Sequence, residues 1–211
     1  MDCFVALLLA MTERAGERML TLYFAPGSSS FAVHIALHEV GVSFEARPMS
    51  FKNNDMRSPE FLAIHPEGKV PTLLIDGRPL TEVAAILYYL AKRFPEAQLL
   101  PRENLEAEAQ ALSWMSFIAS TLHPARRRGL DYARQVYGIA DTRLGQGWAL
   151  GQNYSIADIH LFRLYWRLFN SLKPAPGTFA NLDAHYARMM ARSAVQRTIR
   201  IESAIGYELP A

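Results

Sequence analysis

The chain has 211 residues, of which 50% are hydrophobic and 20% charged, a composition typical of a globular protein rather than a disordered or fibrous one. Its formal net charge is +2 with no long block of one sign, which argues against nucleic acid as a partner. The single cysteine, Cys3, excludes an internal disulfide framework and a thiolate zinc cluster, and it fits a reducing, cytoplasmic location.

The first eighteen residues differ in character from the rest of the chain. Residues 4–11 form a run of eight apolar residues, too short for a membrane-spanning helix, which needs about 20. Asp2 stands where a secretory signal would carry positive charge, and no clear small-residue cleavage site follows. We therefore predict no membrane segment and interpret residues 1–18 as an extension of a fold that begins at Met19. A cleaved signal is the alternative.

From residue 20 onward, strand and helix patterns alternate. Apolar periodicity predicts strands over 20–24 and 42–47, a helix over 31–40 between them, and a short helix after Pro59. Asp76-Gly77 supplies the positive φ of a two-residue turn, which predicts a hairpin joining 72–75 to 78–80. A helix is expected over 82–93, a proline-punctuated linker over 94–104, and only helices after it. This order predicts a small mixed α/β sheet domain docked on an all-helical domain.

Two motifs in the first half suit a peptide ligand. In Gly68-Lys-Val-Pro71, a cis Val70-Pro71 bond would turn the N–H and C=O of Val70 outward, where an extended peptide could pair with them. A trans edge-strand proline is the alternative. Glu82 lies where a helix begins, so its carboxylate and the free first-turn amides can receive an ammonium group and a carboxylate side by side. Taken alone, Glu82 is more simply explained as a favourable first-turn acid.

Four motifs, in this order and spacing, resemble the cytosolic glutathione S-transferase family. They are Tyr23-Phe-Ala-Pro-Gly-Ser-Ser-Ser30, Gly68-Lys-Val-Pro71, Leu80-Thr-Glu82-x-x-Ala85-Ile86-x-x-Tyr89-Leu90 and Gly151-x-x-x-Ser155-Ile-Ala-Asp158. The bacterial beta class is most similar, through Pro26-Gly27-x-x-Ser30, His34-Ile-Ala-Leu37 and Leu122-His123. The resemblance implies a thioredoxin-like domain over 19–99, with a four-stranded mixed sheet that holds glutathione. It also implies a helical domain over 100–211 that lines the electrophile site, and a homodimer.

The resemblance assigns roles to the glutathione-binding positions. Lys69 would meet the glycine carboxylate of glutathione, and Val70, before a cis Pro71, would pair with the cysteinyl backbone. Glu82 and Val83 would hold the γ-glutamyl end. Relatives usually carry Ser or Gly at the position of Val83, so a hydroxyl contact worth about 0.5 to 1.5 kcal/mol is lost here, while the backbone N–H remains.

The position that activates the thiol departs most from the beta class, where a cysteine stands in place of Ser29. A serine cannot form a mixed disulfide with glutathione, but its hydroxyl can donate a hydrogen bond to the thiolate beside the positive end of a helix. Ser28 and Ser30 compete for this role, and one of the three serines can serve only as the helix N-cap.

His123 matches a beta-class histidine that faces the glutathione sulfur. Its neutral imidazole could donate to the sulfur or hold a water molecule. Pro124 follows it where a lysine is usual, so we expect the helix to bend or end near His123. A partly buried structural histidine is the alternative.

The remaining patterns are interpreted as structural. His34 and His38 have the i, i+4 spacing of metal ligands, but no third ligand is evident, so no metal site is predicted. Ser155 and Asp158 fit a helix capping box. The run Arg126–Arg128 could bind an anionic substrate or a partner's acids and is more simply a solvated face. An aromatic stripe with helical spacing is expected to be core or pocket wall: Phe162, Tyr165, Trp166 and Phe169.

We therefore predict a glutathione transferase that acts in detoxification on a small, hydrophobic electrophile. A glutathione-dependent isomerase or dehalogenase is the alternative within the enzymes, because serine-type members of the family include these activities. A non-catalytic glutathione-binding or interaction protein of the same fold is the third hypothesis, motivated by Val83 and Pro124.

Overall fold

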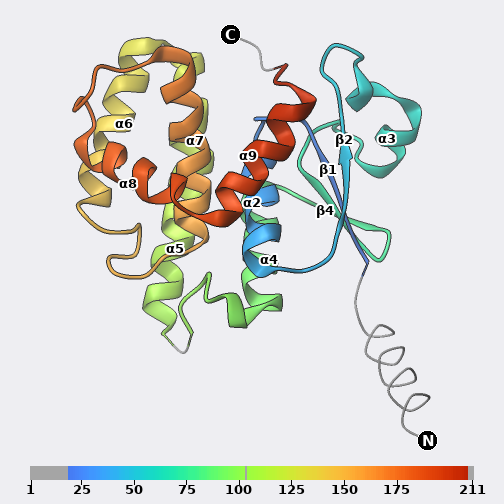
Figure 1. The fold of residues 1–211 in the computed structure, drawn as a ribbon, viewed down its shortest axis with the longest axis horizontal. Helices are drawn as coiled ribbons and strands as arrows, with labels where there is room; N and C mark the ends of the chain where they lie inside the picture. The colour runs from blue at the N-terminus through green and yellow to red at the C-terminus, as the bar shows by residue number, and fades with distance from the viewer. Residues whose placement is uncertain (1–18, 103, 209–211) are drawn as a thin grey trace, which may run out of the picture.

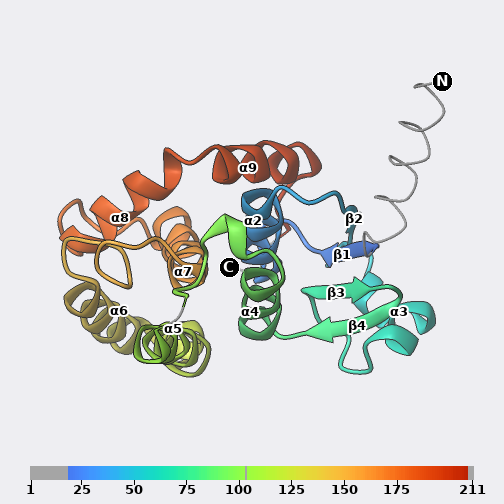
Figure 2. The ribbon, with the colours of Figure 1, turned by 90° about the horizontal axis from the view of Figure 1, so that it is seen from below.

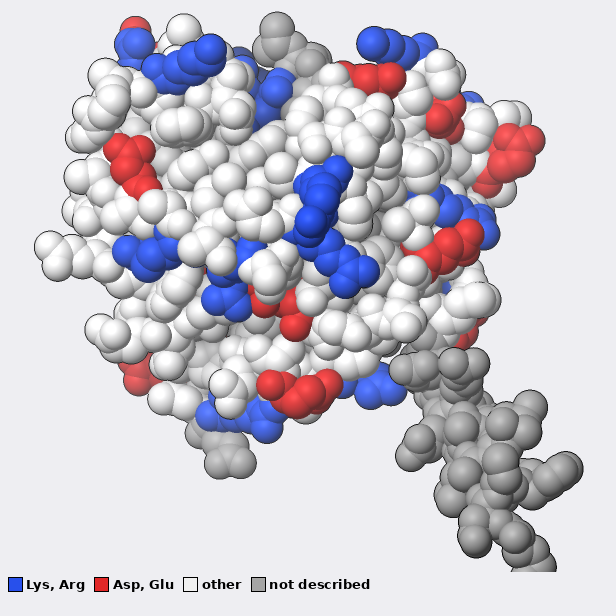
Figure 3. Space-filling model, viewed as in Figure 1, with Lys and Arg blue, Asp and Glu red and all other residues white. Residues whose placement is uncertain are grey.

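The computed structural model describes residues 19–102 and 104–208. The interpretation of residues 1–18, Cys3 included, lies outside these ranges. Within them, no helix combines the length and the apolar character needed to cross a membrane. On the face seen in Figure 3, basic and acidic side chains are interspersed.

A four-stranded mixed sheet forms the first half of the molecule. Its strands are β1 (Leu20–Phe24), β2 (Glu45–Pro48), β3 (Thr72–Ile75) and β4 (Arg78–Thr81), in the order β2-β1-β3-β4. β1 runs parallel to β2 and antiparallel to β3, which pairs with β4 as a hairpin. Helices α2 (Ser30–Val40) and α4 (Val83–Arg93) cover the face turned toward the helical half, and α3 (Pro59–Ile64) lies on the other side (Figures 1 and 2). The predicted thioredoxin-like arrangement is confirmed.

Local sequence explains most of these elements. β1 is buried at every position, as expected for an apolar run covered on both faces. Asp76 and Gly77 have φ values of 51° and 78°, the pair of positive values that the tight hairpin turn requires. The second strand begins later than predicted, because Val42 and Phe44 belong to the incoming loop and pack on the core. This exposed edge strand extends instead to Pro48, which an edge tolerates.

The second half is helical, as predicted. Its elements are α5 (Leu105–Phe117), a π-helical turn η3 (Ile118–Leu122), a 3-10 helix η4 (His123–Arg128), α6 (Leu130–Leu144), α7 (Ile156–Leu172), α8 (Ala180–Met190) and α9 (Ser193–Ile205). Short 3-10 turns η1 (Asp55–Arg57) and η2 (Pro95–Ala97) complete the described elements; the second lies inside the expected linker.

Helix α7 is the centre of the molecule. It contacts α2 and α4 of the sheet half and α5 and α8 of the helical half. Its residues 156–166 are buried without interruption, as expected for a helix that is covered on all sides. The aromatic stripe lies mostly in this core, except Phe169, which is 39% exposed. One hydrophobic core therefore runs through both halves.

The predicted capping box forms at the start of α7. Ser155 Oγ accepts a hydrogen bond from the backbone N–H of Ala157 (3.2 Å), and Asp158 Oδ2 accepts one from the backbone N–H of Ser155 (2.9 Å). Asp158 Oδ1 accepts from the backbone N–H of Ala149 (2.7 Å) and from His185 Nε2 (3.1 Å). Asp158 thus joins the start of α7 to the preceding loop and to α8, which confirms its structural role.

His160, also on α7, is expected to make stability depend on pH. Its side chain is buried, and its Nδ1 has no hydrogen-bond partner in the described ranges. Burial, and then the charges of His123 and Arg163, lower the pKa of His160 from 6.5 to about 3. Below pH 6.5 the His160 side chain becomes protonated in the unfolded chain, whereas in the folded protein it stays neutral until the pH is close to 3. The full stability is therefore present above pH 6.5 and decreases as the pH falls toward 3.

This difference should lower the free energy of unfolding by about 2 kcal/mol between pH 7 and pH 5. Urea unfolding at the two pH values measures it. The variant His160→Gln lacks the titrating ring, so comparison with wild type separates His160 from His38 and His123, whose pKa values are lowered to about 4, mainly by burial. An equal pH dependence in wild type and His160→Gln would contradict the assignment.

Candidate functional site

The sheet register gathers three of the motifs at one end of the sheet. Thr72 of β3 pairs with Tyr23 of β1 on one side and with Thr81 of β4 on the other. The segment 25–30 follows β1, Val70-Pro71 precedes β3, and Glu82 follows β4, so all three leave the sheet at this end. The N-terminus of α2 is therefore beside the backbone of Val70 and the start of α4.

The hydroxyl groups of two of the three serines make hydrogen bonds within the segment 25–30 and stabilise its turn. Ser28 and Ser30 are buried, and their hydroxyl oxygens are 2.7 Å apart. Ser30 Oγ donates to the carbonyl of Ala25 (3.1 Å) and accepts from its N–H (3.2 Å), and Ser28 Oγ accepts from the N–H of Ser30 (3.3 Å). These bonds close the turn before α2, so neither hydroxyl is available to a ligand.

Ser29 differs from its neighbours. It is the N-cap of α2, with helical φ and ψ of −59° and −24°, and it is half-buried. Its hydroxyl makes no capping bond, and no other partner lies within reach among residues 19–102 and 104–208. The positive end of α2 lies directly behind it, so a negative group placed there would meet both a hydroxyl donor and the helix dipole.

The Val70-Pro71 bond is cis. In the described part of the chain, the N–H and C=O of Val70 have no hydrogen-bond partner, so both are open to an extended peptide. Lys69 is exposed, and its ammonium group pairs with Glu67. This hydrogen bond, and the nearby charges of Glu67 and then Glu82, raise the pKa of Lys69, so the side chain is a cation close to Val70.

Glu82 holds an unusual backbone conformation, with φ of 68° and ψ of 122°. A non-glycine residue with positive φ costs about 1 to 3 kcal/mol, and such residues cluster at ligand sites. Glu82 is the N-cap of α4, and its carbonyl accepts from the N–H of Ile86 (3.0 Å), so the helix begins at Val83, one residue later than predicted. The exposed carboxylate makes no capping bond within the described residues and stands at the positive end of α4.

His123 follows the π-helical turn that ends α5, which confirms the predicted change of the helix before Pro124. The residue is exposed overall. Burial of part of its side chain, and then the charges of Arg163 and Arg127, lower the pKa of His123 to about 4. The ring is therefore neutral at pH 7 and can donate or accept a hydrogen bond.

The arginine run beside His123 does not act as one group. Arg127 and Arg128 are exposed, and Arg126 is half-buried. Arg128 Nη1 donates to the hydroxyl of Tyr132 (2.9 Å), and the guanidinium lies over the ring of this tyrosine. Arg128 thus belongs to the surface of α6, as the interpretation of a solvated face predicts.

Sequence reasoning missed two residues that contact the segment 25–30. Arg163 of α7 donates to the carbonyls of Gly27 and Ser28, and Glu202 of α9 accepts from the N–H of Gly27. The available signal for Arg163 was an arginine among the mostly apolar residues 159–166. Glu202 had no such signal, because its helix is polar on one side.

The comparisons with known proteins agree with this arrangement. The family models "Glutathione S-transferase, N-terminal domain" and "Glutathione S-transferase, C-terminal domain" match residues 18–92 and 105–193. Glutathione S-transferase GstA of Escherichia coli O157:H7 is 30% identical over 205 residues, 87% of this chain and 98% of that protein. A maleylacetoacetate isomerase of Rhizobium meliloti is 36% identical over 128 residues, 60% of this chain and 58% of that protein. A glutathione transferase homologue from Sulfitobacter, solved with bound glutathione, has a TM-score of 0.76 and 32% identity, covering 87% of this chain and 98% of that one. The chain belongs to the glutathione S-transferase family.

Proposed function

We propose that this protein is a glutathione S-transferase whose Ser29 hydroxyl stabilises the thiolate of bound glutathione. The observation that carries the proposal is the difference among the three serines: Ser28 and Ser30 are tied into the turn, while Ser29 presents a free hydroxyl at the positive end of α2. A hydroxyl donor and a helix dipole both favour a thiolate over a thiol.

The neighbouring groups fit the rest of glutathione. The open N–H and C=O of Val70 match the cysteinyl backbone, and the cation of Lys69 matches the glycine carboxylate. The carboxylate of Glu82 and the first amides of α4 match the ammonium and carboxylate of the γ-glutamyl end. Val83 supplies its backbone N–H but no hydroxyl, so this end is held by one contact fewer than in relatives with serine.

Once the thiolate has formed, the protein promotes the reaction mainly by holding the thiolate and the electrophile next to each other. The thiol proton leaves to solvent, and a sulfur lone pair forms a bond to the electrophilic carbon. The bond to the leaving group breaks, and the leaving group departs with its electron pair. Holding the two reactants together contributes about 7 to 11 kcal/mol at best. The neutral ring of His123 can donate to the sulfur or hold a water molecule beside it.

The finer assignments belong to the same proposal. The protein is a beta-class-like member with serine at the cysteine position, with a glutathione-binding domain over 19–99 and a substrate domain over 100–211. It acts as a cytoplasmic homodimer on a small, hydrophobic electrophile and uses no metal. The GstA relative and the glutathione-bound Sulfitobacter homologue support the choice of cosubstrate.

Titration of the ultraviolet thiolate absorbance of bound glutathione tests the proposal. In the wild-type protein the bound thiol should ionise below the free value of about 8.5. Ser29→Ala should raise its pKa by about one to two pH units, because a hydrogen bond to a charged group contributes about 1.5 to 3 kcal/mol. At pH values below the pKa of the wild-type bound thiol, the thiolate fraction and with it turnover should fall about 10- to 100-fold.

Ser43→Ala, an exposed serine outside the site, is the matched control and should change neither the thiol pKa nor turnover. An unshifted thiol in the wild-type protein, or no binding of glutathione, would refute the transferase mechanism. Binding with a shifted thiol but no turnover on any electrophile would instead favour the non-catalytic protein.

A glutathione-dependent isomerase is the second candidate, favoured by the similarity to the maleylacetoacetate isomerase. In that reaction the thiolate adds to a double bond and leaves again, so glutathione is not consumed. Measuring glutathione loss alongside product formation separates the two activities. Stoichiometric loss indicates transfer, and product formation with constant glutathione indicates isomerisation.

A further inference from the structure

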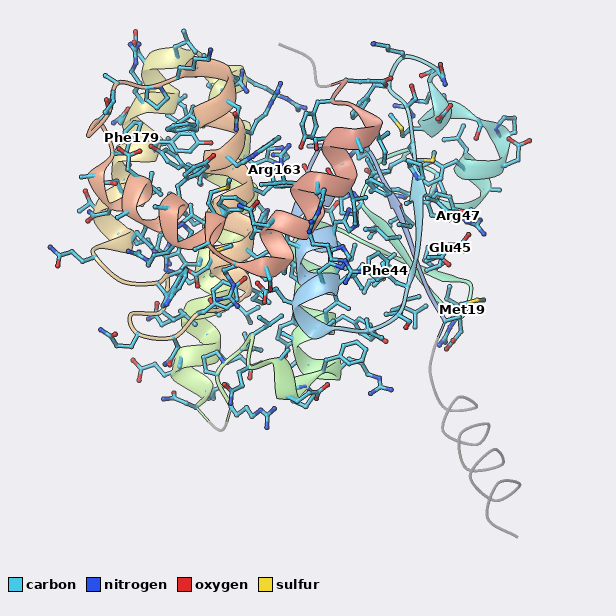
Figure 4. The ribbon with its side chains drawn as sticks, viewed as in Figure 1. Met19, Phe44, Glu45, Arg47, Arg163 and Phe179 are labelled. Atoms are coloured by element: carbon cyan, nitrogen blue, oxygen red, sulfur yellow. The ribbon has the colours of Figure 1, made fainter. Side chains whose placement is uncertain are left out.

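The turn before Ser29 is held from the helical half of the molecule by two buried charged side chains. Arg163 Nε donates to the carbonyl of Ser28 (2.9 Å), and its Nη2 donates to the carbonyl of Gly27 (3.3 Å). Glu202 Oε2 accepts from the N–H of Gly27 (2.6 Å). Arg163 is 6% exposed and Glu202 is fully buried. Figure 4 labels Arg163 where α7 meets the sheet half.

The two side chains bind complementary backbone groups: Glu202 accepts a hydrogen bond from an N–H, and Arg163 donates hydrogen bonds to carbonyl oxygens. A carboxylate holds the amide of Gly27 while a guanidinium holds the two carbonyls that follow, so the peptide groups cannot rotate without losing charge-assisted hydrogen bonds. Glu202 Oε1 also bonds His34 Nδ1 of α2 at 2.7 Å. Among the described residues, Arg163 and Glu202 form no ion pair with each other. Their hydrogen bonds go instead to the Gly27-Ser28 turn and to His34 of α2.

Burying charge is unfavourable unless the surroundings compensate. Burial lowers the pKa of Arg163 to about 10, which still leaves it protonated at pH 7. The charged or titratable groups that act on it are Tyr137, Arg167, Glu202 and Arg126, and its own charge acts on His123 and His160. A fixed positive charge therefore contacts the serine turn and also acts on His123 of the helical half.

We propose that Arg163 and Glu202 are positioning residues for thiol activation. They orient the Gly27-Ser28 turn so that the Ser29 hydroxyl faces the sulfur, and the charge of Arg163 adds to the field that favours the thiolate. This inference rests on the proposed function. It means that residues of α7 and α9 in the helical half help to deprotonate the thiol of glutathione bound to the sheet half.

Thiolate titration of the full-length protein with Arg163→Gln tests the role of Arg163. The variant keeps a hydrogen-bond donor but loses the charge. The pKa of bound glutathione should rise by about one pH unit, a tenfold loss of thiolate at pH values below it, while the dissociation constant for glutathione changes less than about threefold. Arg163→Lys restores the charge and should bring the pKa partly back.

Arg188→Gln is the matched control. Arg188 Nη2 also donates to a backbone carbonyl, that of Gly147 (2.6 Å), but this bond joins α8 to the loop before α7. The control should lower the melting temperature and leave the thiol pKa unchanged. If Arg163→Gln behaves in the same way, Arg163 is merely structural and the inference is wrong.

Glu202→Gln tests the role of Glu202, and it removes a negative charge where Arg163→Gln removes a positive one. Removing a negative charge that contacts the serine turn would by itself favour the thiolate and raise turnover. Loss of the oriented turn lowers turnover, and we expect this effect to prevail with a fall of about threefold or more. A gain in turnover would overturn the role of Glu202. A bound thiol that is unshifted in the wild-type protein would instead refute the proposed function, and this inference with it.

Discussion

Asp158→Ala is expected to lower the free energy of unfolding by about 3 to 5 kcal/mol, because it removes one helix cap and leaves several buried hydrogen-bond donors without an acceptor. The carboxylate is fully buried and accepts hydrogen bonds from the backbone N–H and hydroxyl of Ser155, the N–H of Ala149 and the ring of His185. Loss of the helix cap alone accounts for about 0.5 to 2 kcal/mol. The remainder comes from buried donors that are left without an acceptor.

Urea unfolding measures this loss. Asp158→Asn keeps the size and one oxygen and should lose about half as much, because neutral acceptors form weaker hydrogen bonds than charged ones. The control is Asp131→Ala, whose carboxylate is 98% exposed in an i, i+3 pair with Arg134 and should change stability by less than about 0.5 kcal/mol. Equal effects of Asp158→Ala and Asp131→Ala would show that the contacts of Asp158 are not stabilising.

Gly68→Ala is expected to destabilise the protein by about 2 to 4 kcal/mol and to weaken glutathione binding. Gly68 has φ of 59°, and a Cβ there would lie 2.4 Å from the carbonyl oxygen of Met56 and 2.9 Å from Nη1 of Arg57. The contact with a backbone oxygen cannot be relieved by rotating a side chain. To relieve this contact, the backbone at residue 68 must shift, and this segment is directly before Lys69 and Val70.

Gly77→Ala is the matched control for this prediction. Gly77 also has positive φ (78°), but a Cβ there would meet nothing within 4 Å, so only the backbone penalty of about 1 to 2 kcal/mol applies. Denaturant unfolding gives both stabilities, and calorimetric titration with glutathione gives both affinities. If the two variants lose the same stability and keep the same affinity, the close contact with Met56 does not shape the ligand site.

Much of the fold could be predicted because its signals are local. The run Leu20–Phe24, the turn Asp76-Gly77 and the capping box of Ser155 with Asp158 depend on residues close together in the chain, and all three form as expected. The second strand was misplaced, because an exposed edge strand has little apolar pattern to mark its ends. Family motifs indicated the candidate site residues around these elements, and the register of β1, β3 and β4 brings three of the motif segments together.

The sequence by itself therefore determined the family, the order of elements and the motif segments that the sheet brings together as the candidate site. Only the tertiary structure decided which serine is free, since Ser28, Ser29 and Ser30 are chemically identical and differ only in the partners that the folded turn provides. It also decided the hydrogen bonds that Arg163 and Glu202 make to the turn, which is more than 130 residues away from either of them in the chain. Whether a charge is buried, and what it then binds, depends on the packing of α7 and α9 against α2, and no local pattern encodes that packing.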